Sequence, residues 1–121
     1  MQETGLVFDR EGRTIGWHEP EGRTGGSLPD TDEHWEMLWE NRHRLGGVAH
    51  VHPWDGPARP SSIDLHTYSA IERGLGRRFL WPVVTFTEVM YVAWDETSQQ
   101  YSSVAPHITI ADIEELRRRS R

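Results

Sequence analysis

One short stretch of the chain sets a strand, a proline-rich loop and the start of a helix in immediate succession. Residues 48–52 form a small apolar run that contains His50 and His52, and residues 53–60 form a loop with three prolines. The next residues, from Ser61 to Asp64, have the composition of a first helical turn, with Asp64 placed where the helix dipole favours a carboxylate. A strand that leads into a helix in this way favours a fold in which helices pack on a sheet.

The rest of the chain alternates short strands and helices in the same manner. We expect a hairpin from strands near 4–8 and 14–17, a helix over 30–45 capped by Asp30 and ended by Gly46-Gly47, a strand over 48–52 and a second helix from Ser61 to about Gly74. A strand pair over 79–87 and 89–94, with Pro82 at an edge or a bulge, a strand over 99–104 and a helix over 109–119 complete the order. The sequence therefore predicts a single α/β domain of the α+β type over residues 1–121, with a mixed, mostly antiparallel sheet flanked by helices.

Composition removes several classes of function. The chain has no cysteine, so any metal ion must be held by histidine and carboxylate side chains. A formal net charge of −6 argues against nucleic-acid binding, which needs a basic face. No apolar run approaches the roughly 20 residues of a membrane helix, and Met1-Gln2-Glu3 does not open a secretory signal. We expect a cytoplasmic protein with no nucleic-acid or membrane partner.

The two histidines and the aspartate predict a metal site. Residues i and i+2 of a strand project from the same face with Cα atoms about 7 Å apart, so His50 and His52 can reach one ion. Asp64, fixed by the capped first turn that Ser61 opens, can supply a third ligand. Each motif alone has an ordinary alternative, a pair of hydrogen-bonded imidazoles or a simple helix cap. Together they predict Zn²⁺ with one open position, the pattern of a catalytic site, although iron and cobalt remain compatible.

Other histidines and tryptophans carry weaker signals. His34 and His43 fall on the first predicted helix and are expected to be exposed. Trp35 and Trp39 lie at helical spacing and are expected in the core, as aromatic residues at that spacing usually are. His18 and His107 carry no pattern.

The stretch HVHPWDGPARPSSID resembles the JAB/MPN domain, whose zinc-dependent members are the JAMM metalloproteases. That family combines an upstream glutamate, His-x-His-Pro and Pro-Ser-x-x-Asp, and the segment ETGLVF is similar to its first motif. The resemblance implies an MPN/cytidine-deaminase-like fold. The loop between His52 and Ser61 is one residue longer than is usual in the family.

The resemblance also implies a role for each matching residue. His50, His52 and Asp64 would be the zinc ligands. Glu3 would deprotonate the attacking water and pass the proton to the leaving amine. Ser61 would hydrogen-bond the oxyanion of the tetrahedral intermediate. Separately, the position of Trp54 in the loop beside the histidines suggests that it either lines the substrate groove or anchors the loop.

The implied reaction is hydrolysis of a peptide or isopeptide bond, with the C-terminal tail of a ubiquitin-like or sulfur-carrier protein as the expected substrate. Two alternatives stay open: a non-catalytic MPN-type protein-interaction module, and a binding protein whose histidines are structural. Because Glu3 lies so near the start of the sequence, the strand that follows it must be held in the sheet by something. A second copy of the chain is one candidate, which would make a homodimer.

Overall fold

The computed structural model describes residues 1–121, and a six-stranded sheet organises them. The strands are β1 (Gly5–Asp9), β2 (Thr14–His18), β3 (Leu45–Val51), β4 (Trp81–Val84), β5 (Val89–Asp95) and β6 (Gln100–Ser103), and the helices are α1 (Asp32–Glu40), α2 (Ser62–Leu75) and α3 (Ile113–Arg119). The strand order is β2-β1-β3-β4-β5-β6. Only β3 and β4 run parallel, because α2 makes the crossover between them. The predicted α+β domain with a mixed, mostly antiparallel sheet is confirmed.

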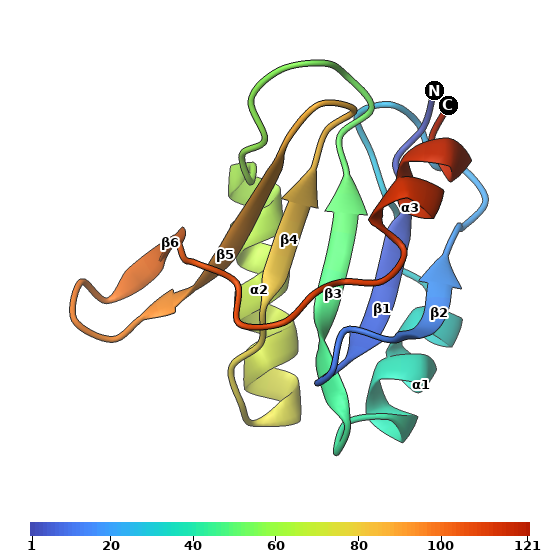
Figure 1. Ribbon diagram of the computed structural model, residues 1–121. Helices are drawn as coiled ribbons and strands as arrows, with labels where there is room; N and C mark the ends of the chain where they lie inside the picture. The colour runs from blue at the N-terminus through green and yellow to red at the C-terminus, as the bar shows by residue number, and fades with distance from the viewer.

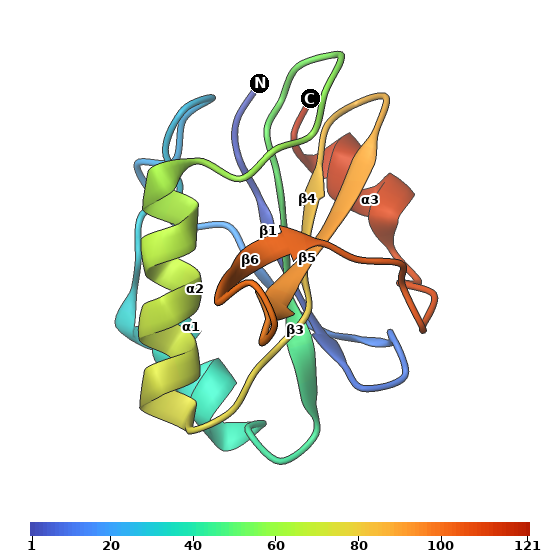
Figure 2. The same cartoon turned by 90° about the vertical axis from the view of Figure 1, so that its left-hand side faces the viewer.

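Helices cover both faces of the sheet. Figures 1 and 2 show α1 and α2 on one face and α3, with the chain that leads to it, on the other. Because side chains alternate along a strand, the strands contribute side chains to two separate cores, one on each face of the sheet. The core under α1 and α2 includes Val7, Val48, Trp81 and Val83, and the core under α3 includes Leu6, Phe8, Ala49 and Val51.

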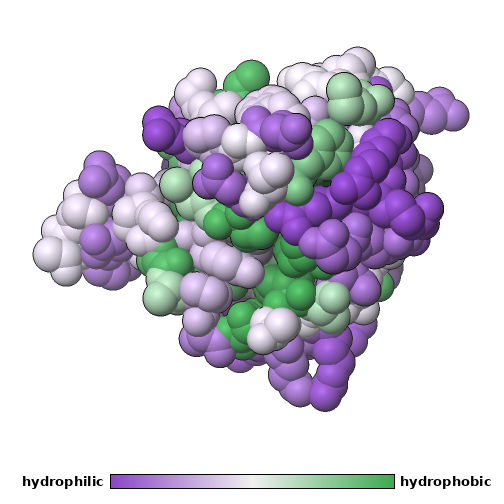
Figure 3. Space-filling view, turned by 45° about the horizontal axis from the view of Figure 1, so that its top comes forward, coloured by the Kyte–Doolittle hydropathy of each residue, from purple (hydrophilic) through white to green (hydrophobic).

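Hydrophilic and hydrophobic side chains gather in different parts of the visible surface. Figure 3 shows hydrophilic side chains gathered over the side that carries α3 and hydrophobic ones toward the middle of that view. The hairpin of β5 and β6 projects from the body of the molecule and is mostly hydrophilic (Figures 1 and 3). None of the helices has the length and apolar character needed to cross a membrane.

The first helix is shorter than its sequence pattern predicted. Its N-cap is Thr31, whose hydroxyl accepts a hydrogen bond from the His34 N–H at 3.1 Å, rather than Asp30. It ends at Glu40, and Leu45 already belongs to β3. Trp39 is 53% exposed, so its expected place in the core was wrong.

Gly46 and Gly47 do not terminate a helix, as the pattern suggested, but lie inside β3. A Cβ atom on Gly46 would stand 2.3 Å from the Asp9 carbonyl oxygen, and one on Gly47 would stand 1.8 Å from the Leu80 carbonyl oxygen. Two neighbouring strands approach β3 so closely here that no side chain fits. These glycines are therefore required by strand packing, which is a tertiary cause.

Two other expectations near the sheet were wrong. Pro82 lies in β4, which is a central strand with a regular register to β5, so Pro82 is neither at an edge nor at a bulge. Leu80 donates its N–H to Gly46 at 3.1 Å, and the alternate residue Pro82 faces β3 without a donor, so one ladder bond is missing. The last helix begins at Ile113 rather than at Thr109.

A buried carboxylate ties α2 to the start of β4 and to the edge strand β6. Glu72, 3% exposed, accepts hydrogen bonds from the Phe79 N–H at 2.9 Å, the Trp81 indole N–H at 3.0 Å and the Tyr101 hydroxyl at 2.5 Å. Arg78 adds an ion pair at 2.8 Å. The charge is thus fully compensated, as burial of a carboxylate requires.

The segment before β1 is held by the chain itself. Gln2 donates its N–H to the Ser120 carbonyl at 3.0 Å, and Glu3 donates to the Thr24 carbonyl at 2.8 Å. The Ser120 hydroxyl donates to Thr4 Oγ1 at 2.9 Å, and Figure 1 shows the two termini side by side. The second copy invoked from the sequence is therefore not needed to hold this strand.

Candidate metal centre

The end of β3 presents both histidines on the face that α1 and α2 cover. His50 pairs with Gly5 of β1 and Val83 of β4, so its backbone is fixed from both sides. His52 lies just past the strand, and its N–H donates to the Val84 carbonyl at 2.8 Å. Both side chains are buried, at 7% exposure each. Rigid backbone and burial leave the imidazoles little freedom to diverge.

Asp64 is fixed by the first turn of α2. The Ser61 hydroxyl accepts the Asp64 N–H at 3.1 Å, and Asp64 Oδ2 accepts the Ser61 N–H at 2.8 Å, which makes a capping box. The same Oδ2 atom faces the two imidazoles. Helix capping therefore orients the carboxylate toward the end of β3, as the sequence suggested.

Three potential ligand atoms meet in a nearly equilateral triangle. His50 Nε2 lies 3.0 Å from His52 Nε2, and Asp64 Oδ2 lies 3.1 Å from the first and 3.2 Å from the second. Ligands at about 2.0–2.1 Å from a tetrahedral zinc ion stand about 3.3–3.4 Å apart, so the observed triangle is only slightly contracted. No arrangement of protons lets all three pairs hydrogen-bond at once, because each neutral imidazole nitrogen is either a donor or an acceptor. A cation at the centre satisfies all three atoms together, and this donor set fits zinc.

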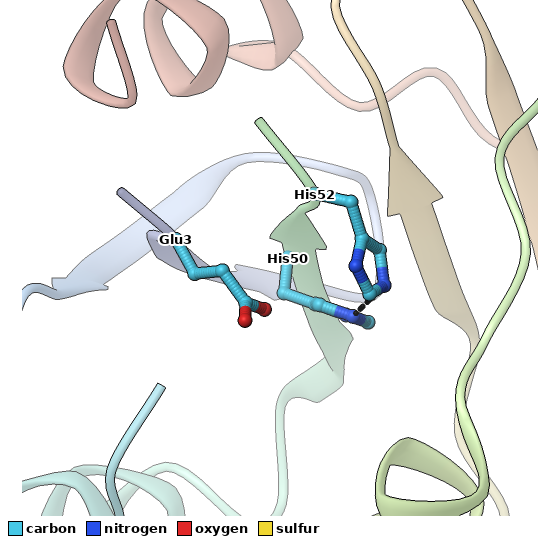
Figure 4. A group of neighbouring side chains, drawn as sticks. All are labelled: Glu3, His50 and His52. Atoms are coloured by element: carbon cyan, nitrogen blue, oxygen red, sulfur yellow. Dashed lines mark hydrogen bonds between the residues drawn. The ribbon is translucent and has the colours of Figure 1, made fainter. Parts of the chain in front are cut away.

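Glu3 lies beside this triangle without joining it. Its carboxylate and the two imidazoles have ligand atoms within 4.8 Å of one another, and Figure 4 shows the three side chains on one side of the sheet, with the Glu3 carboxylate directed toward His50. The only hydrogen bond among the three joins the histidines. Glu3 is thus a second carboxylate that could in principle be a ligand, but Asp64 is the nearer one.

The pKa values of the two carboxylates are shifted in opposite directions. Burial by itself would raise the pKa of Asp64, but hydrogen bonds from His50, His52 and the Ser61 N–H hold it well below the ordinary value. Burial raises the pKa of Glu3, and the nearby histidines only partly offset that effect. One carboxylate is therefore kept ionised as a ligand should be, while the other is inclined to take up a proton.

Ser61 and Trp54 line the same cavity as the three ligands and Glu3, a space of about 400 Å³. Ser61 is exposed, and its oxygen accepts the capping bond, so its own proton remains free to be donated. The Trp54 ring is 45% exposed and lies 4.6 Å from the His52 ring, centre to centre. The structure thus gives Trp54 both a contact with a ligand and a place in the cavity wall.

Three further residues of the cavity wall were not identified from the sequence. His34, expected to be exposed, is 6% exposed and stacks on His18, with ring centres 4.0 Å apart. Tyr68, one helical turn beyond Asp64, is 3% exposed. The apolar spacing of α2 could have placed Tyr68 on the inner face, but no local pattern joins His18 to His34, because they meet only through the packing of α1 against β2.

The comparisons with known proteins do not identify a family for the chain. No family model and no curated protein matches it. A protein from Salinibacter ruber whose solution structure is known is similar at 21% identity, with a TM-score of 0.47, over 93% of this chain and 80% of the other. That likeness is too distant to bear on function.

Proposed function

We propose that the protein is a zinc-dependent metallopeptidase or isopeptidase of the JAMM type, which hydrolyses an amide bond. One observation carries the proposal: His50, His52 and Asp64 converge with ligand atoms 3.0–3.2 Å apart, and a carboxylate oxygen of Glu3 lies within 4.8 Å of both imidazoles. Three ligands, an open position and an adjacent carboxylate of raised pKa form the constellation that hydrolysis by a metal site needs.

The protein residues would divide the work as follows. When bound, zinc supplies Lewis acidity that activates water and polarises the scissile carbonyl. Glu3 accepts the proton of the attacking water and delivers it to the leaving nitrogen, a role that its raised pKa favours because general acid–base groups work best near the operating pH. Ser61 donates its free proton to the developing oxyanion.

The second metal-site carboxylate makes a non-catalytic module less favoured. A scaffold needs neither a buried glutamate beside the ligands nor a cavity of about 400 Å³ at that place. The substrate we propose is a protein or peptide chain, with the tail of a ubiquitin-like or sulfur-carrier protein as the first candidate. A cytoplasmic location belongs to the same proposal.

The direct test combines metal content with cleavage. Protein purified without chelator and reconstituted with zinc is expected to hold close to one ion per chain, and Asp64→Asn is expected to hold much less. Glu3→Gln should keep the ion but lose cleavage of peptide and ubiquitin-like tail substrates by about two to four orders of magnitude, the contribution typical of a general base. His66→Ala, an exposed histidine on the same helix, is the control for general loss of histidine.

Two results would count against the proposal. Absence of zinc affinity in the wild-type protein would remove the metal site. Cleavage that survives Glu3→Gln would show that Glu3 is not the base.

A further inference from the structure

A second cavity lies at the opposite end of β3 from the candidate metal centre. It has a volume of about 610 Å³ and is formed by the starts of β3 and β4 together with the connection from β6 to α3. Figure 1 shows this connection crossing in front of the sheet. Leu45, which lines the cavity, and His50 are five residues apart on one strand, so the two sites are about 17 Å apart. The volume lies in the range of small-molecule sites.

The charged side chains of this cavity wall are all basic. Arg10, Arg77 and Arg78 line it together with His107, and no aspartate or glutamate does. The chain as a whole carries a formal net charge of −6. An anion is therefore repelled by the protein in general but attracted to this cavity.

Arg77 is held in place by the chain and still has unused donors. Its Nη2 atom donates to the Arg42 carbonyl at 3.0 Å and to the Leu45 carbonyl, and its guanidinium lies over the Phe79 ring, 4.3 Å from the ring centre. The Nε and Nη1 atoms have no hydrogen-bond partner in the chain. They remain accessible, because neither is among the buried side-chain atoms that lack a partner. A fixed guanidinium with accessible, unused donors is well suited to bind an anion.

A second uncompensated charge lies near Arg77. Arg10 is exposed and makes no ion pair within the chain. Burial lowers the pKa of Arg77, and the positive charge of Arg10 lowers it further, so the two guanidinium groups are close enough to repel each other. Arg78 differs, because it pairs with the Glu72 carboxylate at 2.8 Å. An anion that contacts both Arg10 and Arg77 replaces this repulsion by two attractions.

The rest of the cavity wall is largely apolar. Leu80, Val104 and Ile108 belong to the core under α3 or pack against it, and Ala93 of β5 lies beside them in the wall. These side chains offer no hydrogen-bonding group, so they match the hydrocarbon part of a ligand. The ligand that fits the whole cavity has a charged group at one end and an apolar body.

We propose that this cavity binds a small amphipathic anion, whose carboxylate or phosphate group pairs with Arg10 and Arg77 and whose hydrocarbon body lies against Leu80, Val104 and Ile108. Guanidinium groups bind both kinds of head group through charge-assisted hydrogen bonds. The site uses none of the residues of the metal centre, so it does not depend on the proposed function.

Eight-carbon probes test the site directly. Octanoate, octyl phosphate and octanol are titrated into isotope-labelled protein and followed by chemical-shift changes in NMR spectra, with metal-free protein so that no head group binds to zinc. At least one of the two anions should shift the amide signals of Gly46, Leu80 and Ala105 saturably and leave that of Val51 unchanged. Octanol should bind at least fivefold more weakly than that anion. Octanoate should bind about two- to fourfold more tightly than hexanoate for each added methylene group.

Two variants of matched charge identify the head-group contact. Arg10→Gln should weaken binding of the anion by about three- to tenfold. Arg13→Gln removes the same charge from the same turn, at an exposed arginine that pairs with Glu11 and does not line the cavity, so it should change the affinity less than twofold.

Four results would overturn the proposal. They are the absence of saturable shifts with either anion, shifts that lie outside the cavity, equal binding of octanol and the anions, and equal effects of Arg10→Gln and Arg13→Gln. Tighter binding of hexaglutamate than of octanoate and octyl phosphate would also overturn it, in favour of an acidic peptide partner. The tighter of the two anions identifies the head group that the site prefers.

Discussion

Replacing Tyr68 by phenylalanine removes one oxygen atom from the protein and should make the fold more stable. The Tyr68 hydroxyl is buried and has no partner in the ligand-free chain. A buried polar group left unpaired costs about 1–3 kcal/mol, whereas the void left by one oxygen atom costs less. We therefore expect Tyr68→Phe to raise the free energy of unfolding by about 1–2 kcal/mol.

Urea titration followed by tryptophan fluorescence measures this change directly. Unfolding entropy of about 2.1 cal/mol/K per residue gives about 0.25 kcal/mol/K for a chain of 121 residues. The expected gain thus corresponds to a rise of about 4–8 °C in the midpoint of thermal unfolding. Both measurements use metal-free protein, so that zinc binding does not enter the comparison.

Tyr101→Phe is the matched control, since it is the same chemical change with the opposite expectation. The Tyr101 hydroxyl donates to the buried Glu72 carboxylate at 2.5 Å, and hydrogen bonds to charged groups contribute about 1.5–3 kcal/mol. Tyr101 is partly exposed, so a loss of about 1–2 kcal/mol is expected. If Tyr68→Phe destabilises the protein as Tyr101→Phe does, the Tyr68 hydroxyl has a partner and the reasoning fails.

Three further predictions concern the metal, the pH and the sheet. Zinc at 100 times its dissociation constant should stabilise the wild-type protein and Glu3→Gln by about 2.7 kcal/mol, with little effect on Asp64→Asn, as thermal unfolding would show; an equal shift in all three would contradict the ligand set. Because the pKa of His34 is about 3 in the fold and near 6.5 in the unfolded chain, the unfolded state binds more protons between these values, and stability should fall on acidification from pH 6.5 by up to about 1.4 kcal/mol per pH unit. Glu3, whose pKa is raised, contributes in the opposite sense: it lowers the stability as the pH rises above 4.5. Removing the His34 titration by His34→Gln should therefore reduce the fall of the urea midpoint on acidification, and an unchanged profile would exclude His34 as its source. Gly47→Ala should unfold the protein or cost more than about 4 kcal/mol, because its Cβ would meet a backbone oxygen, while Gly26→Ala, with nothing within 4 Å, should change urea stability by less than about 1 kcal/mol; tolerance of both would refute the close approach of β3 and β4.

The elements that were predicted well are those whose signals are local. The hairpin of β1 and β2 and the helix α2 follow from turn and capping residues. Ser61 caps α2 as expected, and the helix ends at Leu75, close to the expected end at about Gly74. Local signals failed where packing overrides them. The glycines of β3 imitate a helix end in sequence but serve the approach of neighbouring strands.

The candidate site likewise combines features that local sequence could predict with features that depend on packing. The alternation of His50 and His52, and the capping box that aims Asp64, are properties of one strand and one helix turn, so the sequence could indicate them. The distance between these two elements could not be predicted, because it depends on how α2 packs on the sheet. The arrival of Glu3 beside them depends on hydrogen bonds to Thr24 and Ser120, far along the chain.

By itself, then, the sequence determined which side chains of β3 share a face and how the first turn of α2 orients its carboxylate, since both depend on backbone geometry over a few residues. Only the tertiary structure decided that His18, His34 and Tyr68 form the wall of one cavity below those ligands. The physical reason is that burial and the loss of hydrogen-bond partners arise when distant elements pack together, and no residue carries that information in its immediate neighbours.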